Sequence, residues 1–523
     1  MSQVSYRRRP PYQAGDCILG NSIMALPADR TPVIIGIGEI VDRPADPALA
    51  REPLQLMADA IAAADADAGG GFLHRIDSMD VINLVSWRYD RVAQRLAERL
   101  GINPARAVYA LVGGETPTTK LHDAALRIMN GNSLVAVVTG GEAANAVAKA
   151  KAAGVELPWT PPAAKVENPI IGSEHVTALA VRHGIMAPAH VYPLYENATV
   201  AAWGLTPAAA LAESGVAYAG ISAIAARNPN AWGRKEFTAA EISTVTPENR
   251  MIAYPYTKRM VANNTVNQAG AVLMTNLALA RAAGIAEDRI IHVHGGAAAA
   301  EPMDYLARDQ YTHSVAQDAV LGQAMQIAPD GFDRVELYSC FPTVPKMARR
   351  TLGLAADMVF SVTGGLSFAG AGLNCYMLQS TCAMVRSLRD KPAARALLYG
   401  QGGYVTKHHA LVIGSEAAEP ASLMLPKDVQ DAAEAARAPV PELDLAYAGP
   451  ATLETFSIVY DRDGAPSHGS VIGRTPDGAR VFGKVAVSDG DSCGALLAPD
   501  VSPVGSAGRI TQGDDGLQRW TAA

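Results

Sequence analysis

The sequence predicts an α/β protein with two similar halves, a domain inserted between them and a small all-β module at the C-terminus. Three observations support this fold class. Strand-like and helix-like segments alternate from Thr31 onward, a Gly-Gly turn followed by a helix and a strand occurs in both halves, and the C-terminal residues change to short alternating strands joined by Asp-Gly turns. A chain of 523 residues is too long for one ordinary core, so roughly two to four domains are expected.

The first half opens with a β-branched strand, TPVIIGIGEI, and a helix, PLQLMADAIAAADADA, whose apolar residues recur at helical spacing. Further strands are predicted at IDSMDVINLVS, RAVYALV and SLVAVVTGGEA, and helices at RVAQRLAERLGI and TTKLHDAALRIMNGN. Alternation of this kind is typical of a parallel sheet covered by helices.

The second half repeats this pattern. RIIHVHGGAAAA and RVELYSCF are predicted strands, GGLSFAGAGLNCYMLQSTCAMVRSL is a glycine-rich turn entering a helix, and ARALLYGQGGYVTKHHALVIGS is a pair of strands. In both halves a Gly-Gly turn leads into a helix and then into a strand that ends in Gly-Gly. We interpret this as an internal duplication; chance similarity among α/β units is the alternative.

Composition sets the domain limits. Residues 1–30 are expected to form an N-terminal extension. Residues 31–290 form the first half, including a loop domain at 155–265 that is too long for a simple connection. Residues 291–417 form the second half, 418–450 a linker, and 451–515 a small β-barrel that is expected to have five strands.

Charge and cysteine usage exclude several classes of protein. A net charge of −7 argues against a general nucleic-acid binder, which needs a basic face. The five cysteines show neither a disulfide framework nor metal-binding spacing, so a reducing cytoplasm is the expected location. No uninterrupted apolar run reaches roughly eighteen residues, and no membrane span is predicted. No carboxylate–histidine cluster indicates a metal site.

Four segments carry a family resemblance: NRMIAYPYTKRMVANNTVNQAGAVLM, LYSCFP, GGLSFAGAG and GGYVTKH. Together they resemble the sterol-carrier-type branch of the thiolase superfamily and thiolase-like proteins of the acetyl-CoA acetyltransferase type. The likeness covers about residues 31–417, and the tail at 451–515 resembles the OB-type barrel that some members carry. The resemblance implies the thiolase fold: two duplicated α/β halves in αβαβα layers, with the loop domain over the cleft. It also implies a coenzyme A thioester as substrate, no covalently bound cofactor, and a homodimer paired through the sheet edges.

The residues expected to perform thiolase chemistry are largely missing. A thiolase needs a cysteine thiolate, a second acid/base and two oxyanion holes. The turn that carries the nucleophilic cysteine in the family has Gly114 at that place. The Gly-His-Pro motif becomes Gly370-Ala371-Gly372, and the last cysteine motif becomes Gly400-Gln401-Gly402-Gly403. An ordinary acyl-enzyme is therefore not expected.

Four residues remain as candidates for catalysis: Cys340, Tyr338, His408 and Thr116. Sterol-carrier-type thiolases carry a His-Asp-Cys-Phe motif, and Cys340 matches its cysteine. Cys340 is therefore expected to face the cleft as an acid/base; a buried, inert thiol is the alternative. Tyr338 matches the tyrosine of related retro-aldolases, which carry Tyr-Asp-Cys-Phe and work with an OB-fold partner; a packed strand tyrosine is the alternative. In a strand YVTKHHALVI, His408 and His409 point to opposite faces, and the resemblance favours His408 for the site over an inert hydrogen-bonded histidine.

Five residues are candidates for ligand binding: Lys258, Arg259, Gly114, Gly370 and Asn374. Thr116, after Gly114, and Asn374, after Gly370, begin helices whose free N–H groups can hold an anion or oxyanion, although each could simply cap its helix. The glycine turns are expected to line the thioester site. Lys258 and Arg259 are expected to meet the CoA phosphates, with a solvated surface pair as the alternative.

The sequence therefore leaves three functions open. The first is an acyl-CoA-dependent acyltransferase of the acetyl-CoA acetyltransferase type, with Cys340 and His408 nearest the chemistry and a mechanism altered by Gly114. The second is a retro-aldol carbon–carbon lyase on a CoA thioester, with Tyr338 as acid/base. The third is a catalytically silent acyl-CoA-binding protein, or a scaffold whose OB-like barrel recruits a partner protein.

Overall fold

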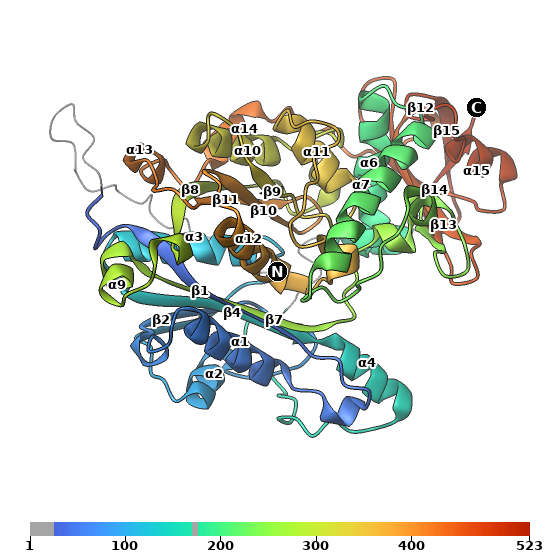
Figure 1. The fold of residues 1–523 in the computed structure, drawn as a ribbon. Coiled ribbons are helices and arrows are strands. Elements are labelled where there is room, and N and C mark those ends of the chain that lie inside the picture. The colour runs from blue at the N-terminus through green and yellow to red at the C-terminus, as the bar shows by residue number, and fades with distance from the viewer. Residues whose placement is uncertain (1–25, 170–175) are drawn as a thin grey trace.

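A central sheet of nine strands organises the molecule (Figure 1). The computed structural model describes residues 26–169 and 176–523, so most of the predicted N-terminal extension lies outside the described residues. The strand order is β3-β2-β4-β7-β1-β8-β11-β10-β9. The strands are β1 (Pro32–Val41), β2 (Ser78–Val81), β3 (Arg106–Tyr109), β4 (Val135–Ala143), β7 (Asn267–Asn276), β8 (Ile291–Ala300), β9 (Arg334–Glu336), β10 (Ala396–Gly402) and β11 (Lys407–Gly414).

The sheet divides into two parts that face each other across two helices. β1 and β8 join the parts through only two residue pairs, Val33–His292 and Ile34–Ile291. Helices α3 (Thr116–Met129) and α12 (Tyr376–Asp390) lie between the parts (Figure 1). The outer layers are α1 (Pro53–Asp67) and α2 (Val92–Leu100) on one side, and α10 (Val315–Ile327), α11 (Thr343–Thr351) and α14 (Gln430–Ala436) on the other. These five layers confirm the predicted αβαβα fold.

The internal duplication is visible in the strand pairing. In the first half α3 leads into β4, which is parallel to β2, and in the second α12 leads into β10, which is parallel to β9. β7 then pairs antiparallel with β4, and β11 antiparallel with β10. The sheet is therefore mixed, and the expectation of a parallel sheet is wrong. The inserted domain before β7 and the tight turn before β11 return the chain in the opposite direction, which helical crossovers do not.

The predicted strand RVELYSCF is shorter than expected. β9 ends at Glu336, and Tyr338 in the following loop has φ of +53°, a left-handed conformation that is costly for a tyrosine. Neighbouring segments hold this loop: Leu337 N donates to Phe360 O at 3.0 Å, and the Tyr218 hydroxyl donates to Ser339 O at 3.0 Å. The residues after β9 thus project from a constrained loop and not from a strand face.

The inserted domain is mainly helical and ends in a short hairpin. After α4 (Ala144–Ala153) it contains α5 (Ala178–His183), α6 (Pro188–Ala202), α7 (Pro207–Arg227), α8 (Ala239–Ser243), β5 (Met251–Ala253) and β6 (Tyr256–Thr257). Among the described residues, α7 alone is long and apolar enough to be a candidate membrane span. Its buried face, with Tyr218, Ile221 and Ala225 fully enclosed, packs within the protein.

The C-terminal module is a closed five-stranded barrel, as predicted. It consists of β12 (Gly449–Tyr460), β13 (Pro466–Arg474), β14 (Arg480–Val485), β15 (Ala507–Gln512) and β16 (Gln518–Ala522), with α15 (Gly490–Leu496) at one side. The barrel closes because β12 pairs with both β13 and β15. β5 also pairs with β12, at Ala253–Val459, so the hairpin of the inserted domain extends the barrel sheet. Fully buried Arg480 donates to Leu306 O and Arg308 O, which fixes the barrel to the second half.

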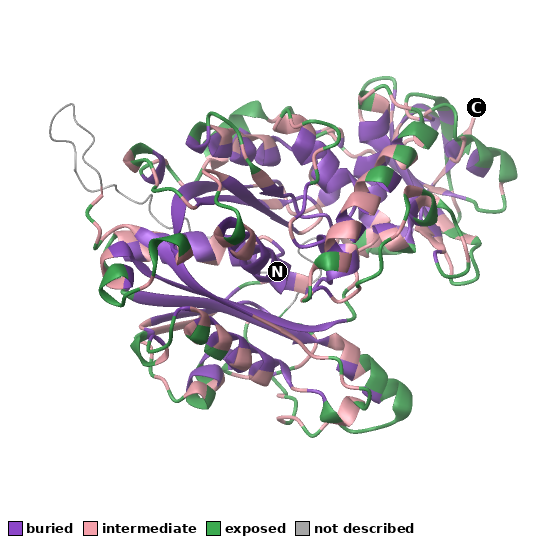
Figure 2. Cartoon of the chain, in the orientation of Figure 1, coloured by how far each residue is buried: buried purple, intermediate pink, exposed green. Residues whose placement is uncertain are grey.

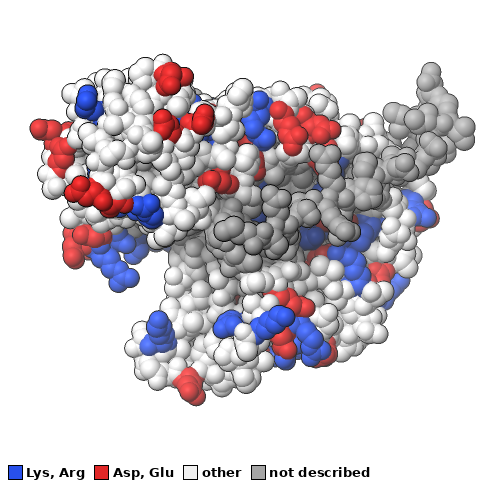
Figure 3. Space-filling view, turned by 180° about the vertical axis from the view of Figure 1, so that it is seen from behind, with Lys and Arg blue, Asp and Glu red and all other residues white. Residues whose placement is uncertain are grey.

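Burial and charge follow the layers. The central strands are buried along their whole length, whereas the outer helices bury one face and expose the other (Figure 2). Acidic and basic side chains are interspersed on the face seen from behind in Figure 3. The described residues visible on that face form no continuous basic surface of the kind that nucleic acid would require.

Candidate active site

The Gly-Gly turn before α3 lies against the loop after β9. An ideal Cβ built on Gly114 would lie 1.8 Å from the Tyr338 hydroxyl and 2.5 Å from Cζ of the same ring. No side chain fits at Gly114 while Tyr338 keeps its place. The position at which the resemblance expects a nucleophilic cysteine is thus a glycine, and a tyrosine hydroxyl fills the adjacent space.

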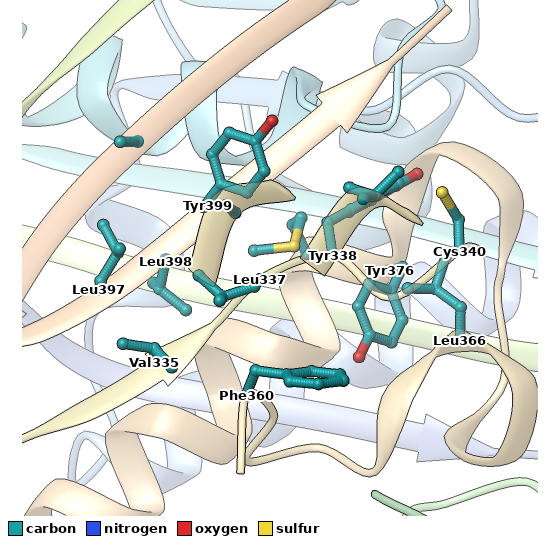
Figure 4. Close-up of a cluster of buried hydrophobic side chains, with 14 of the residues drawn as sticks. Val335, Leu337, Tyr338, Cys340, Phe360, Leu366, Tyr376, Leu397, Leu398 and Tyr399 are labelled. Atoms are coloured by element: carbon teal, nitrogen blue, oxygen red, sulfur yellow. The ribbon is translucent and has the colours of Figure 1, made fainter. Parts of the chain in front are cut away.

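The Tyr338 hydroxyl is buried and has no hydrogen bond within the described ranges of the chain. Burial raises its pKa well above the usual value, and the nearby Cys340 and Glu115 raise it further. The phenol is therefore neutral at physiological pH and able to donate. Figure 4 shows Tyr338 and Cys340 on the same loop, close to Tyr376 of α12 and Tyr399 of β10.

Cys340 is nearly enclosed, with 6% of its surface exposed. Its polar neighbours are an amide and a phenol: Gln401 Nε2 lies 3.6 Å from Sγ, and the same amide group donates to Tyr192 Oη at 2.6 Å. Burial raises the pKa of the Cys340 thiol to about 11. A thiol with this pKa is protonated at neutral pH and is a poor nucleophile.

His408 and His409 point to opposite faces of β11, as expected. His408 lies beneath α10, where Nδ1 is 2.6 Å from the Tyr399 hydroxyl and Nε2 is 3.2 Å from Ser314 Oγ. Burial lowers the pKa of His408 to about 4. His409 faces α3 and lies 3.0 Å from Thr119 Oγ1. His408 is therefore held in a buried network behind Tyr399, and neither histidine contacts the turn at Gly114.

Asn374 and Thr116 do not cap helices, so that alternative is wrong for both. α12 begins at Tyr376, and Asn374 instead joins the two halves: it accepts from Gly113 N at 3.2 Å and donates to Asn83 O at 3.0 Å. The Thr116 hydroxyl donates to Leu111 O at 3.2 Å. Both side chains therefore support the backbone of the Gly113 turn.

Glu115 and Lys407 were not among the site residues predicted from the sequence. The Glu115 carboxylate folds back over its own turn, so a Cβ built on Gly113 would lie 2.3 and 2.4 Å from its two oxygens. One built on Gly402 would lie 2.2 Å from Oε2. Lys407 Nζ is 3.5 Å from Oε1 and donates to Val112 O at 2.5 Å. The glycines at 113 and 402 were the only sequence signal of this arrangement.

Glu142 is a second carboxylate that the sequence did not single out. It ends the buried strand β4 and accepts from Val85 N at 2.7 Å and Ser86 N at 2.8 Å. Burial raises its pKa to about 7. Glu142 lies near Cys375 and Gly372, in the turn where the family has Gly-His-Pro. In that turn Gly370 has φ of +106°, which favours glycine.

Lys258 and Arg259 belong to a cationic cluster on the inserted domain, which we call the basic patch: Lys235 and Arg259 beside Phe237, and Lys258 next to Arg259 in the chain. The Arg259 guanidinium lies 4.4 Å and Lys235 Nζ 4.8 Å from the centre of the Phe237 ring. Phe237 in turn packs against Phe368 at 5.7 Å. Within residues 26–169 and 176–523 no member of the patch forms a salt bridge. The Glu241 carboxylate interacts electrostatically with Lys235 and Arg259, so the three cations of the patch face one nearby negative charge.

The same described ranges contain no group of three or more His, Cys, Asp or Glu side chains arranged to hold a metal ion. The chemistry available in the site is thus that of a phenol, two carboxylates, a thiol and an amide.

Comparisons with known proteins agree with this architecture. Residues 428–515 match the family model of the thiolase-like protein type 1 additional C-terminal domain. The crystal structure of a monomeric SCP2-thiolase like protein type 1 from Mycobacterium smegmatis is 28% identical, with a TM-score of 0.78 over 95% of this chain and 100% of that chain. No match to a curated protein sequence was found.

Two further structures share the fold at lower identity. An Ltp2-ChsH2(DUF35) aldolase is 17% identical, with a TM-score of 0.57 over 75% of this chain and 98% of that chain. Human mitochondrial 3-ketoacyl-CoA thiolase in complex with CoA is 14% identical, with a TM-score of 0.56 over 76% of this chain and 100% of that chain.

Proposed function

We propose that this chain of the thiolase superfamily binds acyl-CoA thioesters and cleaves or forms a carbon–carbon bond beside the thioester carbonyl, without an acyl-enzyme. The observation that carries the proposal is the Tyr338 hydroxyl in the space beside Gly114. A residue without a side chain cannot attack a thioester, whereas a neutral buried phenol can donate to a developing oxyanion.

Retro-aldol chemistry suits such a site. Cleavage between the α- and β-carbons sends the bonding electrons into the thioester enolate, whose oxygen must be stabilised by a donor. The unpartnered Tyr338 hydroxyl supplies this donor and needs no change of protonation state before the reaction. The aldolase that shares the fold is consistent with this chemistry on a thiolase scaffold. At its low sequence identity, the similarity shows a common fold and nothing about the reaction of this chain.

An acyltransferase remains the second candidate, because the Gln401 amide lies 3.6 Å from the Cys340 sulfur and could orient a thiolate there. This route must deprotonate a thiol whose pKa is about 11. Cys340 would then carry the acyl group in place of a residue at Gly114, with His408 acting only through Tyr399.

For the CoA moiety, we assign the phosphates to the basic patch and the thioester to the turns at Gly114 and Gly370, with Thr116 and Asn374 supporting them. Lys258 is exposed, and Lys235 and Arg259 both lie over the Phe237 ring, where the three cations outnumber the nearby Glu241 carboxylate. Two cations beside an aromatic ring suit a nucleotide with phosphate groups. A structure that shares the fold was solved in complex with CoA.

We further propose that the protein is a monomer, and not the homodimer expected from the resemblance. The edge strand β3 is available for pairing only if its outer side is open. Asn168 Nδ2 donates to Tyr109 O at 2.8 Å, and residues 165–168 line a surface pocket together with Ala107 and Tyr109, so this segment passes along the outer side of β3. The barrel, joined to the inserted domain through β5 and β12, is likewise a fixed part of the protomer. The similar protein from Mycobacterium smegmatis is described as monomeric.

The proposal is tested by exchange of the α-protons of propionyl-CoA in D₂O, followed by NMR. The wild-type protein is expected to catalyse exchange, and Tyr338→Phe is expected to bind propionyl-CoA with similar affinity but to lose most of the exchange rate. Binding without exchange in the wild-type protein would indicate the silent binder. Exchange unaffected by Tyr338→Phe but lost in Cys340→Ser would favour the acyltransferase.

A further inference from the structure

We infer that Glu115 is the catalytic proton acceptor of this site and takes the proton of the β-hydroxyl of a 3-hydroxyacyl-CoA thioester. The inference rests on the proposed lyase function and adds to it a base and a substrate class. It is carried by the placement of Glu115 relative to Gly113, Gly402 and Lys407.

Two glycines from distant parts of the chain make room for one carboxylate. Ideal Cβ atoms at Gly113 and Gly402 would both overlap the Glu115 carboxyl group. A third glycine, Gly114, makes room for the Tyr338 hydroxyl. The Glu115 carboxylate and the Tyr338 hydroxyl therefore occupy the places where side chains of the consecutive residues 113 and 114 would lie. A retro-aldolase needs such a pair, a base for the hydroxyl and a donor for the enolate oxygen, at one substrate.

One oxygen of the carboxylate is free to act. Glu115 Oε2 is buried and has no hydrogen-bond partner in the described part of the chain. A buried carboxylate oxygen without a donor is unfavourable, and such exceptions call for a functional explanation. A substrate hydroxyl that donates to Oε2 would satisfy it. The Tyr338 hydroxyl, also without a partner, is left for the thioester oxygen.

The other oxygen is positioned by a lysine. Lys407 Nζ lies 3.5 Å from Oε1 and is itself held by Val112 O at 2.5 Å. Lys407 occupies the first position of β11, so its place is fixed by the sheet. We regard it as a positioning residue, because it reaches the substrate only through Glu115.

The reaction balances within the substrate. Glu115 accepts the β-hydroxyl proton, the β-carbon becomes a carbonyl, and the bond between the α- and β-carbons breaks. Its electron pair forms the thioester enolate, whose oxygen accepts a hydrogen bond from Tyr338. The proton held by Glu115 is then returned, directly or through water, to the α-carbon. The products are a ketone or aldehyde and a shortened acyl-CoA, and no oxidant or second substrate is consumed.

The test uses 3-hydroxy-3-methylbutyryl-CoA as probe, with acetone and acetyl-CoA as measured products. Glu115→Gln keeps the shape of the side chain and removes the base, so kcat should fall by roughly 100-fold or more. The Kd for acetyl-CoA should stay within about threefold, and the Tm should change little, because the amide keeps the shape of the side chain and Lys407 keeps its hydrogen bond to Val112 O. Glu156→Gln, an exposed carboxylate that follows α4 and belongs neither to the site nor to the basic patch, serves as the charge control and should match the wild-type protein.

The outcomes separate this inference from the proposed function. If the wild-type protein cleaves the probe and Glu115→Gln cleaves it at a similar rate, the base is elsewhere and the lyase function stands. A large fall in Tm of Glu115→Gln together with the loss of kcat would indicate a structural role. In that case Glu115→Asp, which keeps the carboxylate on a shorter side chain, must lose kcat while retaining the fold. A wild-type protein that neither cleaves the probe nor exchanges α-protons contradicts the lyase function and the inference with it.

Discussion

The Tyr338 hydroxyl occupies the space into which a side chain at Gly114 would extend. The two residues lie in different halves of the duplicated fold. Only a glycine at position 114 accommodates the tyrosine, and the Gln401 carbonyl oxygen, 2.4 Å from the same Cβ position, closes the space further. The loop that carries Tyr338 adopts a left-handed conformation to place it there. Strain of this kind is found where the surrounding structure fixes a functional side chain.

Adding one methyl group at this point should therefore be costly. Gly114→Ala overlaps the Tyr338 ring and is expected to lower the free energy of unfolding by about 1–3 kcal/mol or more. Urea denaturation measures the change. Gly322→Ala is the matched control: Gly322 lies within α10 with nothing near its Cβ position, so alanine should be neutral or stabilising by up to about 1 kcal/mol. Equal stability of Gly114→Ala and the wild-type protein would show that Tyr338 moves away freely.

Much of the fold followed from the sequence. The recurring Gly-Gly turn, helix and strand identified the duplication, because local spacing sets these elements, and the Asp-Gly turns identified the barrel strands. The opposite orientation of His408 and His409 followed from strand geometry alone. Strand direction in the sheet did not follow, since β7 and β11 are returned by connections whose paths depend on the whole fold.

The site was less accessible from the sequence, because its contacts join distant residues. Asn374 reads locally as a helix cap but bonds to Gly113, and Glu115 is defined by Gly402 and Lys407 from the other half. Tyr338 was singled out by resemblance, yet its positive φ and its fit to Gly114 depend on packing between the halves. Glu142 gave no local signal, since its raised pKa arises from burial at the end of β4.

Glu142 should give the protein a measurable pH dependence of stability. Its pKa is raised from 4.5 to about 7 in the folded state, so its contribution is fully present below about pH 4.5 and is lost as pH rises through 7. Relative to Glu142→Gln, the wild-type protein should lose about 3 kcal/mol of stability between pH 4.5 and 8. Chemical denaturation across this range tests the difference. Glu236→Gln, which changes an exposed carboxylate, is the control, and its stability difference from the wild-type protein should not change with pH. A pH-independent difference between Glu142→Gln and the wild-type protein would mean that Glu142 is ionised throughout.

The basic patch should act on the phosphates of CoA. Lys258→Gln combined with Arg259→Gln is expected to weaken acyl-CoA binding about tenfold, because charge-assisted contacts to phosphate are lost. Binding of the matching acyl-pantetheine, which has no nucleotide, should be unchanged. Titration calorimetry gives both affinities, with Lys151→Gln on the exposed surface of α4 as control. Equal weakening for both ligands would place the patch away from the phosphates.

The covered edge of β3 should keep the protein monomeric. Light scattering coupled to size-exclusion chromatography is expected to give the mass of one chain over a wide range of concentrations. Asn168→Ala removes the donor to Tyr109 O and should, if anything, increase association by uncovering the edge. A stable two-chain mass for the wild-type protein would instead support the homodimer expected from the family resemblance.

The central claim is that this site works through Tyr338 and without an acyl-enzyme, and intact-protein mass spectrometry tests it most directly. The protein is incubated with acetyl-CoA and with a longer acyl-CoA at neutral pH, and ligand binding is confirmed in the same sample. The account predicts an unmodified mass with both thioesters, because Gly114 has no nucleophile and the pKa of the Cys340 thiol is about 11. A stable acyl adduct mapped to Cys340 would contradict the account and make that cysteine a relocated nucleophile of an acyltransferase.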